Sequence, residues 1–142
     1  MKSIIVLLNL IMMATCLEAY CIYNDLPEGG GTFWIRQQPD NAGGLYTSRF
    51  SREALGPGDK ACCPYTTSDC VKSTNKEDIV SFTFRRTSPG LEYPPVVINC
   101  PGGGWITMGG GNDPVLATID VFNPDGTPYN FQYRVDHQAG YL

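Results

Sequence analysis

Three cysteines lie within nine residues of one another, and their thiols have the clearest capacity for chemistry in this chain. The segment Ala-Cys-Cys-Pro-Tyr-Thr-Thr-Ser-Asp-Cys holds Cys62, Cys63 and Cys70. In an oxidising compartment such thiols form disulfides. Neighbouring cysteines seldom bond to each other, because a disulfide needs Cα atoms about 4.4–6.8 Å apart with converging Cβ vectors. Cys62 and Cys63 are therefore expected to bond to different partners.

Two further cysteines, Cys21 and Cys100, complete the disulfide candidates outside the N-terminal segment. The sequence predicts a short loop closed by Cys63 and Cys70, and a second bridge from Cys62 to either Cys21 or Cys100. One thiol is then left over. It is expected either to be buried and unpaired, which we favour, or to join two chains.

The first nineteen residues have the pattern of a secretory signal peptide. A basic residue precedes an apolar run from Ile4 to Thr15, and the small residue Ala19 ends the segment. The alternative is a membrane anchor, but a bilayer core needs roughly 20 apolar residues and this run is shorter. We expect cleavage after Ala19, which leaves residues 20–142 as a single secreted, extracellular domain.

The charge of the chain limits the classes of partner. Its formal net charge is −4, and loss of residues 1–19 removes one basic and one acidic residue, so the balance does not change. The pair Arg85-Arg86 is the only place where two basic residues adjoin. Nucleic-acid binding is not expected, because it needs a concentrated basic surface.

Metal binding is not expected either. The cysteine spacing lacks a Cys-x-x-Cys pair, and His137 is the only histidine. An EF-hand loop set on Asn123 and Asp125 would need an acid where Val121 stands. A turn explains those residues better, and Asn112-Asp113 offers only two side chains where calcium takes six to eight oxygens.

No catalytic constellation stands out, so no catalytic residue and no cofactor are predicted. Gly-x-Ser-x-Gly and His-Glu-x-x-His are absent, and no Gly-Lys-Ser/Thr follows the glycine runs at 102–104 and 109–111. Asp136 adjoins His137, but successive strand residues face opposite ways, which argues against a pair. Two loop carboxylates that meet in space would still suit a glycosidase.

Two tryptophans, Trp34 and Trp105, are the candidate ligand-contact residues. Glycines flank Trp105 on both sides and have no side chains to cover its ring. One interpretation is a flat ligand lying on this ring, since a large aromatic gives contact area at little entropy cost. The other is that both rings pack in the core.

Short apolar runs between Gly, Pro, Asn and Asp predict an all-β, disulfide-stapled fold of eight or nine antiparallel strands. The predicted arrangement is a β-sandwich, with a β-barrel as the alternative. In residues 80–85, Val80, Phe82 and Phe84 should face the core and the residues between them the solvent. The apolar run 96–100 is expected to be a central strand.

Two local predictions concern the ends of strands. Residues 45–50 are expected to be extended, and residues 52–55 to form one helical turn before Gly-Pro-Gly. At the C-terminal end, residues 115–121 and 129–135 alternate in hydropathy around the turn Asn-Pro-Asp-Gly. A type I turn closed by a glycine bulge is predicted at 123–126, which would join the two runs as a hairpin.

Three segments carry a resemblance to known proteins: Tyr-Cys-Ile-Tyr-Asn at 20–24, Pro-Gly-Asp-Lys-Ala-Cys-Cys-Pro at 57–64, and Asn-Cys-Pro-Gly-Gly-Gly-Trp at 99–105. With the signal pattern, the chain resembles the small secreted cysteine-containing proteins of filamentous fungi. In the order of these features it is also similar, more faintly, to aegerolysins and thaumatin-like proteins. Thaumatin-like proteins have many more cysteines, and the aegerolysin tryptophan cluster is not reproduced here.

The resemblance to small secreted fungal proteins implies a secreted β domain, and most such proteins have no assigned activity. The fainter likeness to aegerolysins and thaumatin-like proteins implies a β-sandwich that binds membrane lipids or cell-wall glucans. The leading hypothesis is a secreted, non-enzymatic binding or interaction protein, such as a fungal effector at a host or cell-wall surface. A membrane-active, aegerolysin-like toxin is second and a secreted hydrolase is third. The candidate partners are a cell-surface polysaccharide, a membrane lipid or a host protein.

Overall fold

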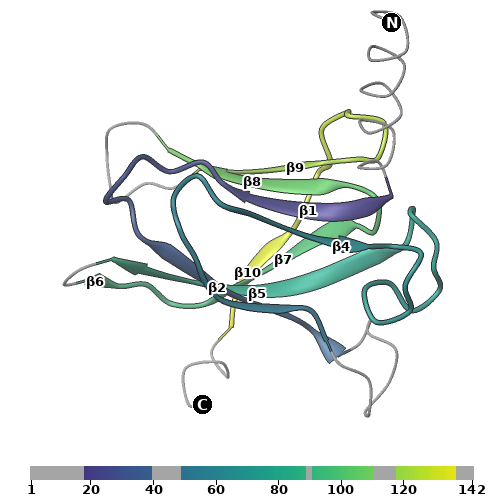
Figure 1. The fold of residues 1–142 in the computed structure, drawn as a ribbon, viewed down its shortest axis with the longest axis horizontal. Coiled ribbons are helices and arrows are strands. Elements are labelled where there is room, and N and C mark those ends of the chain that lie inside the picture. Colours follow the sequence, from purple (N-terminus) through teal and green to yellow (C-terminus); the bar gives the residue numbers. More distant parts are fainter. Residues whose placement is uncertain (1–17, 40–48, 89–90, 111–117, 137–142) are drawn as a thin grey trace, which may run out of the picture.

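The computed structural model describes residues 18–39, 49–88, 91–110 and 118–136. These residues form ten strands and no α-helix. The strands make two sheets that lie one above the other (Figure 1). The all-β sandwich predicted from the sequence is confirmed, and in the described part of the chain the sheets do not close into the alternative barrel.

The first sheet, sheet A, has the strand order β4 (Lys60–Pro64), β1 (Ala19–Asn24), β8 (Trp105–Gly109) and β9 (Thr118–Phe122). Strands β1 and β8 run parallel, whereas the other pairs are antiparallel. The prediction of a wholly antiparallel fold is wrong at this pair. Parallel strands need a long connection, and here the chain builds most of the second sheet between β1 and β8.

The second sheet, sheet B, has the order β10 (Tyr133–Val135), β7 (Val96–Pro101), β5 (Ile79–Ser88), β2 (Thr32–Gln37) and β3 (Ser51–Leu55), and β6 (Leu91–Glu92) pairs with the end of β5. All of these pairs are antiparallel. Because β7 has a neighbour on both sides, the central position predicted for residues 96–100 is confirmed.

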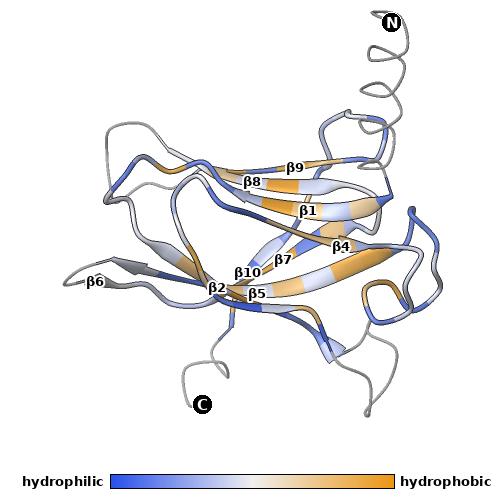
Figure 2. Ribbon diagram, in the orientation of Figure 1, coloured by the Kyte–Doolittle hydropathy of each residue, from blue (hydrophilic) through white to orange (hydrophobic). Residues whose placement is uncertain are grey.

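The core lies between the sheets, and hydrophobic segments alternate with polar ones along β1, β8 and β5 (Figure 2). Val80, Phe82 and Phe84 are at most 2 % exposed, as the alternation predicted. Thr83 was predicted to face solvent and is buried instead. Its hydroxyl accepts a hydrogen bond from the Gln38 amide and donates to the Asp136 carboxylate at 3.3 Å, which satisfies a polar group on the outer face of sheet B.

Four aromatic rings join the two sheets across the core. Tyr20 of sheet A meets Phe82 of sheet B edge-to-face, with ring centroids 5.0 Å apart. Phe50 lies 5.4 Å from Tyr20 and 6.1 Å from Phe82, and Phe84 lies 6.2 Å from Phe82. Such T-shaped pairs stabilise a fold beyond the area they bury. Phe82, which touches the other three rings, is the centre of this cluster.

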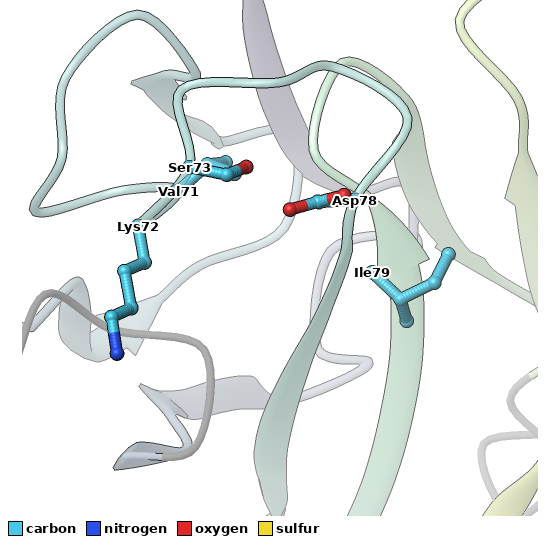
Figure 3. A pocket seen from close by; sticks show the side chains of 5 residues that line it. All are labelled: Val71, Lys72, Ser73, Asp78 and Ile79. Carbon is cyan, nitrogen blue, oxygen red and sulfur yellow. The ribbon is translucent and has the colours of Figure 1, made fainter.

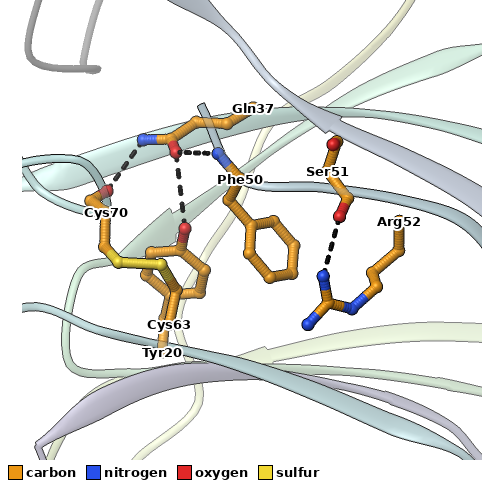
Figure 4. The surroundings of a disulfide bond; sticks show 7 residues. All are labelled: Tyr20, Gln37, Phe50, Ser51, Arg52, Cys63 and Cys70. Atoms are coloured by element: carbon orange, nitrogen blue, oxygen red, sulfur yellow. Dashed lines mark hydrogen bonds between the residues drawn. A yellow bond between two sulfur atoms is a disulfide. The ribbon is translucent and has the colours of Figure 1, made fainter. Parts of the chain in front are cut away.

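A buried glutamine adds a polar link between the sheets (Figure 4). Gln37 of β2 donates its amide N–H to the carbonyl of Cys70 at 2.7 Å. Its carbonyl oxygen accepts from the Phe50 N–H at 3.3 Å and from the Tyr20 hydroxyl at 3.4 Å. Because a buried amide must be hydrogen-bonded to be tolerated, Gln37 fixes the loop that carries Cys70 against the core.

Both predicted disulfides are present. Cys63 bonds to Cys70 and closes the short loop, and Cys62 bonds to Cys21, one of its two predicted partners. Cys100 is free and buried, which is the outcome favoured for the fifth thiol. The two bridges leave from opposite faces of β4, as expected for neighbouring strand residues.

The helical turn predicted at residues 52–55 is wrong, because this segment is strand β3. Its backbone pairs with β2, with Arg52 opposite Ile35 and Leu55 opposite Phe33. Pairing with a neighbouring strand outweighs a weak local helical preference. Of the stretch 45–50 predicted to be extended, only Arg49 and Phe50 lie in the described residues, and they precede β3.

The predicted C-terminal hairpin is correct at its turn and at the residues next to the turn, and wrong beyond them. Gly126 has a φ of +88° and donates its N–H to the Asn123 carbonyl at 2.9 Å, as a glycine at the end of such a turn should. Directly after the turn the chain pairs back on β9, through an antiparallel bridge between Phe122 and Pro128 and a hydrogen bond from the Tyr129 N–H to the Val121 carbonyl at 2.8 Å. It then leaves sheet A, and β10 pairs with β7 of sheet B. Hydropathy alternation predicts a strand but not which neighbour it joins.

Candidate functional site

An apolar row crosses the outer face of sheet A from one edge to the other. Register places Cys62 of β4 beside Cys21 of β1, Cys21 beside Trp105 of β8, and Trp105 beside Phe122 of β9. The residues that alternate with them, among them Ile22, point into the core. The outer face of an exposed sheet is ordinarily polar, so this aromatic and disulfide row, which we call the outer row, is a candidate contact surface.

The rings of the outer row are stacked rather than scattered. The Trp105 indole lies 5.0 Å from the Phe122 ring at an interplanar angle of 19°. Phe122 can cover only one face of the indole. Both residues are half-buried, which leaves part of each ring accessible.

A hollow of about 210 Å³ opens beside the indole. It is lined by the following residues, which come from β1, the loop before β8, β8 itself and the turn after β9: Ala19, Cys21, Tyr23, Gly103, Gly104, Trp105 and Pro124. Gly103 and Gly104 thus line a space next to Trp105, and the interpretation that a flat ligand lies there stays a prediction. Tyr23, Phe122 and the Cys21–Cys62 disulfide were not predicted as parts of this surface.

Two of the glycines pack too closely against neighbouring residues to carry a side chain without some adjustment. A Cβ at Gly104 would overlap the carbonyl oxygen of Phe122, and one at Gly103 would lie 2.7 Å from the Cβ of Lys76. Gly126, in the turn beyond β9, has its Cα hydrogen directed toward the edge of the indole, where a Cβ would lie 3.6 Å from the ring. Of these three glycines, Gly126 is the one whose missing side chain would contact the indole.

Trp34, the other candidate aromatic, lies elsewhere. It alternates with the buried residues Phe33 and Ile35 on β2, so its ring lies on the outer face of sheet B. The guanidinium of Arg85 sits over this ring at 5.7 Å from the centroid. The two tryptophans therefore lie on opposite outer faces of the sandwich and do not form one site.

A second hollow, of about 350 Å³, is lined by Val71, Lys72, Ser73, Asp78 and Ile79. Figure 3 shows the Asp78 carboxylate directed toward Ser73, while the Lys72 side chain extends away from both. The Ser73 hydroxyl accepts a hydrogen bond from the Asn75 N–H at 3.1 Å, so it serves to shape the turn. This arrangement is a polar loop surface, without the bonded nucleophile and base that covalent catalysis uses.

In the turn that was considered as a calcium site, the Asp125 carboxylate accepts hydrogen bonds from within the turn itself. Asp125 accepts from the Thr127 hydroxyl at 2.6 Å and from the Thr127 N–H at 2.9 Å, and these bonds hold the pKa of its carboxyl below the usual value. Among the described residues, no group of three or more His, Cys, Asp or Glu side chains is placed to hold a metal ion. His137, Asn112 and Asp113 lie outside the described residues.

The buried thiol of Cys100 predicts a specific pH dependence. Burial raises the pKa of Cys100 far above its usual range, whereas the unfolded thiol ionises near 8.5. Above about pH 8.5 the unfolded state is therefore favoured by ionisation, and the unfolding free energy should fall by up to about 1.4 kcal/mol per pH unit. Tyr20, whose pKa burial also raises, adds to this fall above about pH 10.

The control is Cys100→Ala, compared with the wild type between pH 7 and 10 in stopped-flow unfolding that is faster than thiol–disulfide exchange. The variant should lose stability less steeply between pH 8.5 and 10. Parallel pH curves for the two proteins would contradict the assignment of Cys100 as the titrating group.

Comparisons with protein-family models, curated proteins and solved structures found no match to this chain. The described ranges contain no helix long and apolar enough to span a bilayer. The two disulfides of this small domain are compatible with an extracellular protein.

Proposed function

We propose that this chain is a secreted, non-enzymatic binding protein, of the kind that fungi release to act at a host or cell-wall surface, whose contact site is the outer row. The observation that carries the proposal is the hollow beside Trp105. A half-buried indole, stacked on a second ring and bordered by glycines, is arranged for contact rather than for core packing. The likeness to small secreted fungal proteins agrees with this proposal.

Secretion is supported by the N-terminal signal pattern together with the two disulfides. Cleavage after Ala19 would remove the first residue of β1 and the carbonyl of Glu18, which accepts a hydrogen bond from the Tyr65 N–H at 3.0 Å. The remaining strand keeps Tyr20 in the core and the bridge from Cys21 to Cys62. The mature domain therefore retains the four residues of the outer row, whereas the hollow loses Ala19 from its lining.

Binding is favoured over catalysis by the composition of the hollow. Among the described residues that line it there is no carboxylate and no histidine, and Tyr23 alone has an ionisable side chain outside a disulfide. General acid–base catalysis needs a group whose pKa lies near the working pH. A secreted hydrolase remains the third candidate, and product formation from any polysaccharide would support it.

A membrane-active protein is the second candidate, and one observation favours it. On β10, Tyr133 is 66 % exposed and Val135 is 37 % exposed, so two apolar side chains face solvent on sheet B. Exposed aromatic and aliphatic groups can insert into a lipid interface. This surface lies away from Trp105, so the two candidates predict different residues at the contact.

The test compares Trp105→Ala with Trp34→Ala in the oxidised mature protein. Both variants are screened against insoluble polysaccharides, liposomes and host surface proteins. Trp105→Ala should weaken the binding found for the wild type by about 10- to 100-fold, because a ring of this size contributes on the order of 1.5–3 kcal/mol when buried.

Trp34→Ala should bind within twofold of the wild type, and similar thermal midpoints would show that both variants are folded. Tyr133→Ala is screened as a third variant. Equal loss of binding affinity in Trp105→Ala and Trp34→Ala, or loss of affinity only in Tyr133→Ala, would refute the outer row as the site.

A further inference from the structure

We infer that the ligand of the outer row is a neutral, pyranose-based polysaccharide, with one sugar ring seated in the hollow against Trp105. This inference rests on the proposed function and names its ligand class. It is drawn from the size, charge and polar edges of the hollow.

The shape of the hollow suits one flat ring. At about 210 Å³ it is smaller than the roughly 300–1,000 Å³ of sites for larger ligands. Its walls include two flat rings, the indole and Pro124, and the side-chain-free Gly103 and Gly104, while Cys21 and Tyr23 line the side toward β1. The negative face of an indole attracts positively polarised C–H groups, and a pyranose presents such a C–H face.

The charge of the surface favours a neutral ligand. Among the described residues that line the hollow, none has a side chain that is charged at neutral pH. Cleavage after Ala19 adds one positive charge beside it, the α-ammonium of Tyr20, which is too little to form a basic patch. In the next row of the sheet, Lys60 lies beside Tyr23 at one edge and Asp120 lies beside Thr107 at the other. These opposite charges stand on strands at the two sides of the sheet, so they create no patch of one sign to recruit a polyanion or an anionic membrane.

Polar groups border the apolar hollow where sugar hydroxyls would lie. Tyr23 and Thr107 are register neighbours, both half-buried, and both place a hydroxyl on the outer face of sheet A. A sugar ring combines an apolar face with hydroxyls at its edge and can use both features. An acyl chain would leave these hydroxyls without partners, at a desolvation cost.

The length of the outer row points to a polymer. It crosses four strands, from Cys62 to Phe122, which at about 4.8 Å between strands is roughly 14 Å. The hollow accepts one ring, and the row continues on both sides of it. Neighbouring sugar units of a chain would contact Phe122 on one side and the disulfide on the other.

The experiment measures binding of the oxidised mature protein to four neutral hexasaccharides, β-1,3-glucan, β-1,4-glucan, chitin and mannan, and to their monosaccharides. Polygalacturonate and vesicles of phosphatidylcholine with and without phosphatidylserine are the other arms. At least one neutral hexasaccharide should bind, and its affinity should be at least tenfold higher than that of its monosaccharide. This affinity should not change between about 0.05 and 0.5 M salt, whereas binding that depends on charge would be lost over that range.

The matched variant is Tyr23→Phe, which keeps the ring and removes one hydroxyl. It should weaken glycan binding by about 3- to 10-fold, and Trp105→Ala should weaken it further. Binding only to polygalacturonate or to vesicles, lost in Trp105→Ala, would overturn the inference while the proposed function stands. Absence of binding to all four neutral glycans overturns the inference, and absence of any Trp105-dependent binding overturns the proposed function as well.

Discussion

Replacing Phe82 with alanine is expected to lower the unfolding free energy by about 3–5 kcal/mol, the range for aromatic-to-alanine changes in a core. Phe82 is fully buried and contacts the rings of Tyr20, Phe50 and Phe84. Phe82 thus lies where sheet A meets sheet B. The substitution would leave a cavity there, and the strands on both sides of it would hinder its collapse. Since small domains have total stabilities of about 5–15 kcal/mol, the variant should be marginally folded.

Urea unfolding of the disulfide-bonded protein measures this effect. Thr87→Ala is the control, because Thr87 lies on the same strand with an exposed side chain and should change stability by no more than about 0.5 kcal/mol. A loss below about 1.5 kcal/mol for Phe82→Ala would mean that the aromatic cluster does not join the sheets as described.

The two disulfides are expected to contribute unequally. The Cys21–Cys62 bridge spans 41 positions of sequence and the Cys63–Cys70 bridge spans 7. Restriction of the unfolded chain grows with the enclosed loop, which gives roughly 4 kcal/mol for the first bridge and roughly 2.5 kcal/mol for the second. Cys21→Ser with Cys62→Ser should therefore destabilise the fold more than Cys63→Ser with Cys70→Ser.

Urea unfolding of the two double variants and the wild type tests this order. The short bridge also positions the Cys70 carbonyl that accepts from Gln37, so its loss includes some native-state disturbance. If the short bridge proved the more stabilising of the two, the unfolded-state argument would be wrong for this chain and native contacts of the loop would dominate.

The parts of the fold that were predicted correctly depend on short-range patterns. Alternation at Val80, Phe82 and Phe84 defines a strand and its buried face, and the geometric exclusion of a Cys62–Cys63 bond constrains the disulfide partners. The incorrect parts depend on contacts between distant segments. Residues 52–55 become a strand because β2 lies beside them, and β10 joins β7 instead of β9. Nothing within either segment encodes that choice.

The candidate site shows the same division. Trp105 and its glycines stand together in the sequence, and one of the two interpretations of them was that they leave room for a flat ligand. Tyr23 and Phe122 come from strands about 80 residues before and 17 after Trp105, and register alone brings them onto one face. The sequence signal for these residues was an aromatic at an outward-facing position of each strand. This signal indicates a shared surface only once the strand order β1-β8-β9 is known.

The most direct test of the outer row as the binding site uses the indole N–H signals of the two tryptophans. A ¹H–¹⁵N spectrum of the oxidised mature protein resolves one indole signal for Trp34 and one for Trp105, assigned with Trp34→Phe. On titration with the neutral hexasaccharide that binds most tightly, the signals of the Trp105 indole and of the Gly103 and Gly104 amides should shift, whereas that of the Trp34 indole should stay in place. Shifts confined to Trp34, to β10 or to residues 71–79 would contradict the account.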